Sequence, residues 1–111
     1  MSDEVKKYLT DILESVLAIE EYLGEQRNFH SYNNTRQLRD AIERRLEIIG
    51  EATNRAMKLS PDLKITHARR IVDLRNKVIH GYDTVSNTTI WAVIVNDLPT
   101  LKEEIESLLK K

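Results

Sequence analysis

Apolar residues in the first part of the chain recur at alternating spacings of four and three. Such spacing places them along one face of a helix. The stripe consists of Val5, Leu9, Ile12, Val16, Ile19 and Leu23. Ser2 can cap the start of this helix and Gly24 can end it. We therefore predict a helix between these two residues. Its stripe faces either the core of a helical bundle or a partner helix, and the period alone favours the core.

Two further helices are predicted in the middle of the chain. Residues 25–34 have no helical period and predict a loop. A second helix is expected from about Thr35 to Leu59, followed by a turn at residues 60–62, Ser-Pro-Asp. Its inward positions are Leu38, Ile42, Ile49, Ala52 and Ala56. A third helix is expected to begin near Thr66, a good capping residue, and to end at Gly81. It carries Ile71, Leu74 and Val78 on its apolar side.

The C-terminal region predicts a fourth helix, capped by Asn87 or Thr88. Pro99 must kink or interrupt it, because proline lacks a backbone donor and clashes with the preceding turn. The apolar positions are Ile90, Trp91, Ile94, Leu98, Leu101, Ile105 and Leu108. Four amphipathic segments with short connections favour an all-α fold, a four-helix bundle with a kinked C-terminal helix. We expect residues 1–111 to form one domain.

Composition narrows the possible functions. The chain has no cysteine, which excludes disulfides, thiolate catalysis and cysteine-ligated zinc. Acidic residues stand where a signal peptide carries positive charge, and no apolar run is long enough to cross a bilayer, so we expect a cytoplasmic protein. The net charge of −1 is unevenly distributed. Residues 60–82 carry five basic and two acidic side chains, and can either meet phosphate or form solvated helix faces.

Common catalytic frameworks are absent from the sequence. With three glycines in the chain, no phosphate-cradling loop is possible. The three histidines, His30, His67 and His80, do not share a metal-ligand spacing on one helix. We therefore expect neither a metal nor another cofactor.

Residues 75–82, Arg-Asn-Lys-Val-Ile-His-Gly-Tyr, combine a permanent cation, a histidine and a tyrosine at the end of a predicted helix. Arginine binds phosphate with a planar fork of donors, and histidine exchanges protons near neutral pH. In a straight helix the step from Arg75 to His80 rotates about 140°. The two side chains therefore meet only if the helix end distorts or a second chain completes the pocket. The spacing alone favours structural roles, in which Arg75 forms an ion pair, His80 caps the helix and Tyr82 packs a loop.

The Arg-x4-His-x-Tyr pattern of Arg75, His80 and Tyr82 resembles that of HepT-like toxins of the HEPN superfamily, in which a polar residue such as Asn76 usually follows the arginine. Residues 45–52, Arg-Leu-Glu-Ile-Ile-Gly-Glu-Ala, resemble the family's second-helix stretch. Trp91 and residues 96–101, Asn-Asp-Leu-Pro-Thr-Leu, resemble its final-helix stretch. The family commonly has a Pro-Trp pair before the arginine, which is missing here, where residues 66–70 read Thr-His-Ala-Arg-Arg.

This resemblance implies a HEPN-type fold and a homodimeric, metal-independent endoribonuclease that forms a cyclic phosphate product. It assigns proton transfer to His80, binding of phosphate and transition-state charge to Arg75, and orientation of either one to Asn76. The implied partner is a minimal nucleotidyltransferase antitoxin that transfers AMP to Tyr82. Lys77, Arg69 and Arg70 are candidates for further RNA contacts, with an ordinary solvated surface position as the alternative for each arginine.

Two alternatives remain open at this point. The chain could be a non-catalytic subunit that binds nucleotide or partner in a nucleotidyltransferase complex, or a purely structural dimeric bundle. The structural alternative requires Arg75 and His80 to be buried and mutually satisfied.

Overall fold

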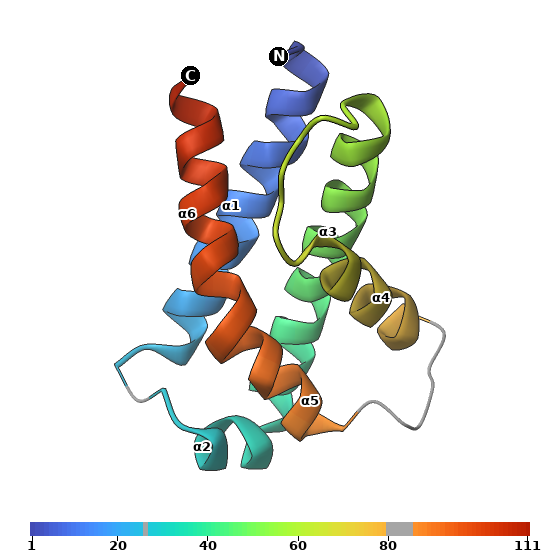
Figure 1. The fold of residues 1–111 in the computed structure, drawn as a ribbon. Helices are drawn as coiled ribbons and strands as arrows, with labels where there is room; N and C mark the ends of the chain where they lie inside the picture. Colours follow the sequence, from blue (N-terminus) through green and yellow to red (C-terminus); the bar gives the residue numbers. More distant parts are fainter. Residues whose placement is uncertain (26, 80–85) are drawn as a thin grey trace.

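The computed structural model describes residues 1–25, 27–79 and 86–111, and these residues form helices and connections without strands. The helices are α1 (Asp3–Leu23), α2 (Phe29–Asn34), α3 (Arg36–Leu59), α4 (Ala68–Ile79), α5 (Asn87–Ala92) and α6 (Leu98–Lys110), with a π-helical turn η1 (Val93–Asp97) between the last two. Figure 1 shows α1, α3 and α6 running along one another, with both termini at the same end. The predicted all-α class is confirmed. None of the helices in the described ranges is long and apolar enough to cross a membrane.

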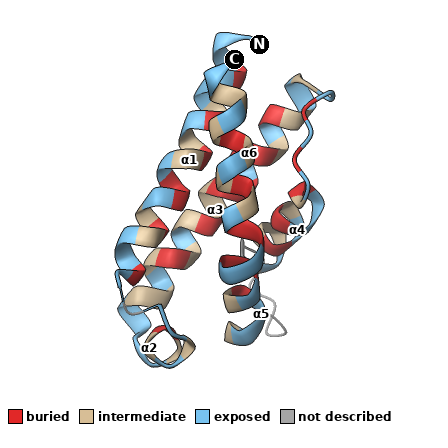
Figure 2. Cartoon of the chain, turned by 60° about the vertical axis from the view of Figure 1, so that its left-hand side comes forward, coloured by how far each residue is buried: buried red, intermediate tan, exposed pale blue. Residues whose placement is uncertain are grey.

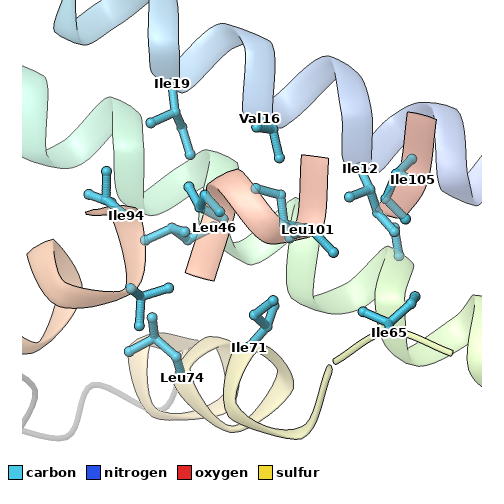
Figure 3. Close-up of a cluster of buried hydrophobic side chains, with 14 of the residues drawn as sticks. Ile12, Val16, Ile19, Leu46, Ile65, Ile71, Leu74, Ile94, Leu101 and Ile105 are labelled. Atoms are coloured by element: carbon cyan, nitrogen blue, oxygen red, sulfur yellow. The ribbon is translucent and has the colours of Figure 1, made fainter. Parts of the chain in front are cut away.

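Helix α1 (Asp3–Leu23) has the predicted bounds and caps. The Ser2 hydroxyl accepts a hydrogen bond from the backbone N–H of Val5, and Gly24 follows the last residue with a φ of 61°. All six stripe residues are buried, and they pack against α3 and α6. Figure 3 shows three of them, Ile12, Val16 and Ile19, facing side chains of these neighbouring helices. The stripe therefore faces the core of the chain, and the alternative, that it faces a partner helix, is wrong.

The predicted loop over residues 25–34 is wrong in its second half, where α2 (Phe29–Asn34) forms. The Asn28 side chain caps this helix by accepting from the backbone N–H of Ser31 at 2.8 Å. Tyr32 is completely buried against Trp91, with ring centroids 5.4 Å apart. A helix of six residues is too short to show a period, so tertiary packing and the cap specify it.

Helix α3 (Arg36–Leu59) is confirmed as predicted, and its apolar face also includes Leu46, which the prediction left out. The turn after it is present, with the backbone N–H of Leu63 donating to the Ser60 carbonyl. Thr66 does not begin the next helix. Its backbone N–H and hydroxyl donate to the Glu104 carboxylate of α6, and α4 (Ala68–Ile79) starts two residues later. The predicted stop at Gly81 lies outside the described residues.

The C-terminal segment is helical but not uniform. Ser86 is the cap, accepting from the backbone N–H of Thr89 at 3.1 Å, so the prediction of Asn87 or Thr88 was off by one or two residues. The predicted interruption takes the form of the π-helical turn η1, which ends just before Pro99 in the first turn of α6. Figure 2 shows that buried residues nevertheless continue along the inner side of this segment.

Candidate active site

Arg75 lies where α4 crosses α3, directly against Gly50. A Cβ atom placed on Gly50 would stand 2.3 Å from the Arg75 Cβ and 2.7 Å from its Cγ, closer than two carbons can approach. The stem of Arg75 therefore packs on the backbone of α3, and this packing is possible only because residue 50 has no side chain. The arginine as a whole is half-buried.

The guanidinium of Arg75 is partly satisfied by its neighbour. Its Nη1 donates to the Asn76 Oδ1 at 3.0 Å. Its Nε is buried and has no hydrogen-bond partner among the residues that the structure describes. A buried N–H without a partner is costly, so this one calls for an explanation. The Asn76 side chain therefore orients the guanidinium through Nη1, and other N–H groups of the guanidinium stay without a side-chain partner among the described residues.

The other two motif residues, His80 and Tyr82, lie outside the described residues, as does Gly81. The structure therefore places Arg75, Asn76 and Lys77 of the motif near the end of α4. It leaves the predicted meeting of Arg75 with His80 untested.

A groove of 730 Å³ lies on another side of α4, between this helix and α5 with η1. Arg69, Arg70 and Lys77 line it, and Asp73 is the acidic residue among them, but nothing in the groove tests whether these residues contact RNA. Leu74 and Val93, both buried in the core, lie at its bottom. Because Lys77 follows Asn76 in the chain, the groove begins next to the motif.

Arg70 is paired with Asp97, a residue that sequence analysis did not single out. Its Nε donates to Asp97 Oδ2 at 2.8 Å and its Nη2 to Asp97 Oδ1 at 2.7 Å. The same Nη2 lies 3.2 Å from His67 Nδ1. The Asp97 side chain is 2% exposed and that of Arg70 60% exposed, so a buried carboxylate holds an exposed cation. The only sequence signal was the position of Asp97 inside the Asn-Asp-Leu-Pro-Thr-Leu stretch.

Potential metal ligands do not gather in the described ranges, where no three acidic or histidine side chains form a group. His67 lies beside the groove. His30 lies on α2, where its ring nitrogen contacts the Asn34 amide. Neither histidine is close enough to carboxylates in the number and geometry that a metal centre requires.

Comparison with known proteins gives one family. Residues 12–108 match the family described as "Ribonuclease HepT-like". The chain is 35% identical over 109 residues to a "Probable ribonuclease HepT" of Thermococcus cleftensis, covering 95% of this chain and 96% of that protein.

Relatives in Methanocaldococcus jannaschii agree with this match. One named "Putative RNase" is 33% identical over 107 residues, covering 93% of this chain and 94% of that protein. Another, named "Gamma-glutamylcyclotransferase and putative RNase", is 35% identical over the full length of this chain, which spans half of that protein. No solved structure matches the chain. With a match that covers nearly all of its length, the chain belongs to the HepT-like ribonuclease family.

Proposed function

We propose that this protein is a cytoplasmic, metal-independent endoribonuclease, the toxin of a HEPN/MNT toxin–antitoxin pair. The observation that supports this most is the setting of Arg75. Its stem is fixed against Gly50, its Nη1 is held by Asn76, and its buried Nε has no partner among the described residues. A guanidinium that is oriented in this way near the end of α4 can bind the phosphate of an RNA strand.

The reaction proposed is transesterification within RNA. The ribose 2′-oxygen attacks the adjacent phosphorus, the bond from phosphorus to the 5′-oxygen breaks, and a 2′,3′-cyclic phosphate remains. One group removes the proton of the 2′-hydroxyl and another delivers a proton to the leaving 5′-oxygen. We assign proton transfer to His80 and stabilisation of the phosphorane charge to Arg75, with Asn76 orienting the arginine. A homodimer would bring a second His80 to supply the other proton transfer.

Control of the activity is proposed to act at Tyr82. A partner nucleotidyltransferase would attach AMP to its hydroxyl, two residues after His80. The added phosphodiester would carry a negative charge that competes with RNA for Arg75, and its bulk would close the site. Co-expression with the nucleotidyltransferase, followed by peptide mass spectrometry, should show an AMP adduct on Tyr82 together with loss of cleavage. If the partner fully neutralises a still-toxic Tyr82→Phe variant, control does not act through this hydroxyl.

The proposed chemistry is tested by incubating the purified protein with tRNA and mRNA in excess EDTA. Wild type should cleave, while His80→Ala and Arg75→Ala should each lose cleavage. Arg75→Lys should also lose most activity, because an ammonium keeps the charge but not the planar fork. The matched control is Arg36→Ala, which removes an exposed cation from the start of α3.

Thermal unfolding of the same variants separates chemistry from folding. Arg75→Ala keeps the Cβ that touches Gly50, so we expect a small loss in melting temperature and retained helical content. Cleavage that returns only when a divalent ion is restored would refute the metal-independent mechanism. A collapse of the fold in both the Arg75 and His80 variants would favour a structural role for this segment.

A further inference from the structure

The groove beside α4 contains one cation that the fold holds in a set orientation. Arg70 presents the Nε and Nη2 edge of its guanidinium to Asp97, and each of these nitrogens bonds to a different carboxylate oxygen. Within the described part of the chain, Nη1 makes no hydrogen bond to another side chain, and the side chain as a whole is 60% exposed. Because Nη2 also contacts His67 Nδ1, Nη1 is the donor that the pair leaves available to a ligand in the groove.

Asp97 differs from the carboxylate of an ordinary surface ion pair. It is the last residue of the π-helical turn η1, and its side chain is 2% exposed. The His67 ring also contacts Arg70 Nη2, which restricts the movement of the guanidinium further. An exposed arginine on its own samples many rotamers and loses that freedom when it binds. Here the buried carboxylate has already fixed the side chain.

The remaining lining of the groove suits a nucleic-acid strand. Lys77 lies two helical turns after Arg70, about 10 Å along the axis of α4, and it adjoins the Arg75 motif. Leu74 and Val93 lie at the bottom of the groove, and both are buried in the core. A groove with several cations along it suits the phosphate backbone of a single strand.

We propose that this groove binds the RNA strand next to the bond that is cleaved, that Arg70 binds a backbone phosphate there, and that Asp97 is the residue that positions Arg70. The identity of the ligand as RNA rests on the proposed function. The ligand chemistry itself, a phosphodiester on a fixed guanidinium, rests on the geometry of the pair.

The test measures binding separately from cleavage. A short, fluorescently labelled 2′-O-methyl oligonucleotide lacks the attacking hydroxyl and stays intact, so its anisotropy reports binding alone. Arg70→Gln should weaken binding about tenfold at low salt, because it removes a charge-assisted contact. It should also reduce the slope of log affinity against log salt by about 0.7, the value for one phosphate contact to a single strand. Arg36→Gln, which removes a cation from the start of α3, is the matched control.

Substitution of Asp97 separates positioning from charge. If Asp97 acts only through its charge, Asp97→Asn removes a repulsive carboxylate and should tighten RNA binding. If it positions Arg70, Asp97→Asn should weaken binding several-fold, and the double variant with Arg70→Gln should bind no more weakly than Arg70→Gln alone. Arg70→Lys tests the same geometry at an exposed position. An ammonium cannot fill both Asp97 oxygens and a phosphate in one plane, so this variant should also bind more weakly.

Cleavage by the Arg70 variants gives a further readout. With cleavable RNA, Arg70→Gln should raise KM and leave kcat nearly unchanged, since it removes binding that ground state and transition state share. Equal binding by Arg70→Gln and Arg36→Gln, or tighter binding by a folded Asp97→Asn variant, would overturn the proposed subsite. Binding that depends on Arg70 in a wild-type protein that cleaves no RNA would instead overturn the ribonuclease function and leave the subsite standing.

Discussion

Gly50 determines how closely α3 and α4 approach each other, and through that contact it determines where Arg75 stands. The arginine stem takes up the space that a side chain at residue 50 would need. A glycine within a helix normally lowers its stability relative to alanine. Its presence here is explained by the contact between α3 and α4, because the Arg75 stem packs in the space that a side chain would fill.

Gly50→Ala should therefore destabilise the protein although it improves helix propensity. Overpacking costs about 1–3 kcal/mol, and propensity returns up to about 1 kcal/mol. Since the new Cβ would meet Arg75 Cβ and Cγ, the helices must move apart, and we expect a lower melting temperature together with loss of RNA cleavage. Circular dichroism melts and a cleavage assay measure both. Lys58→Ala, at an exposed position of the same helix, is the control, and an equal or higher melting temperature for Gly50→Ala would contradict the close contact.

Glu43 on α3 gives a prediction of pH dependence. Burial raises the pKa of its carboxyl above the ordinary 4.5, the Asp40 carboxylate raises it further, and Arg39 opposes both. The folded state therefore favours the protonated form. Below pH 4.5 the carboxyl is protonated in both the folded and the unfolded state, so it costs no stability. As the pH rises from 4.5 through the raised pKa, the free energy of unfolding falls, and above the raised pKa the loss is complete.

Glu43→Gln should accordingly raise the melting temperature at pH 7 and change it little at pH 4. Melts of the variant and wild type at the two pH values measure the difference. Glu14→Gln, an exposed position on α1, serves as the control for loss of a carboxylate. The same gain at both pH values would show that the carboxyl is not responsible.

The residues of the site differ in how far sequence could identify them. The Arg-x4-His spacing was enough to single out Arg75, because the motif is local in the chain. The contact between Arg75 and Gly50 joins residues 25 positions apart, and the pair of Arg70 with Asp97 joins residues 27 apart. No local pattern specifies such contacts, because they depend on how the helices cross.

At the scale of elements, α2 (Phe29–Asn34) is fastened to α5 by aromatic packing. The Tyr32 ring lies against Trp91, and Phe29 packs on both. The Tyr32 hydroxyl is buried and has no hydrogen-bond partner among the described residues. Burial raises the pKa of Tyr32, so the hydroxyl stays neutral. The ring, and not the hydroxyl, should therefore carry the contribution to stability.

Tyr32→Phe should leave the melting temperature unchanged or slightly higher, and Tyr32→Ala should lower stability by about 3–5 kcal/mol, as for other large aromatic truncations. Trp91 is the single tryptophan of the chain, so its fluorescence reports on this contact directly. We expect a red shift in its emission for Tyr32→Ala and none for Tyr32→Phe. A red shift of the same size in both variants would show that the hydroxyl is essential.

The long helices were predictable from sequence because each carries an apolar face that repeats over several turns. Helices α1 and α3 were placed within a residue or two on that basis. The prediction failed where the specifying contacts come from elsewhere in the chain. Glu104 of α6 takes up the donors at Thr66, so α4 begins later than its sequence suggests, and Trp91 supports α2.

At the scale of the whole molecule, a single motif histidine per chain leaves the proposed reaction short of a second proton-transfer group. We therefore expect a homodimer, although α1, whose stripe is buried in the core, gives no support for it. Light scattering at micromolar concentration should report about twice the 12.9 kDa of one chain. A strict monomer with full activity would contradict a site shared between two chains.

Mixing two inactive variants examines the dimer more sharply. If each pocket draws Arg75 from one chain and His80 from the other, Arg75→Ala and His80→Ala chains should regain part of the activity when combined. If both groups of a pocket come from the same chain, neither pocket of a mixed dimer is complete. Each variant mixed with itself is the control, and the absence of any recovery would show that the pocket is not shared in this way.

The π-helical turn η1 also determines how sequences of this kind should be aligned. Buried residues Ile90, Ile94 and Leu98 follow one another at steps of four, which drift around a regular α-helix by about 80° in total. The wider turn absorbs this drift, so that Leu101 and Ile105 still face the core. A relative with one residue fewer between positions 93 and 97 would continue as ordinary α-helix, and its alignment would need a gap there. Because the carboxylate that holds Arg70 is the last residue of this turn, a deletion in the turn and a change at position 70 should tend to occur together.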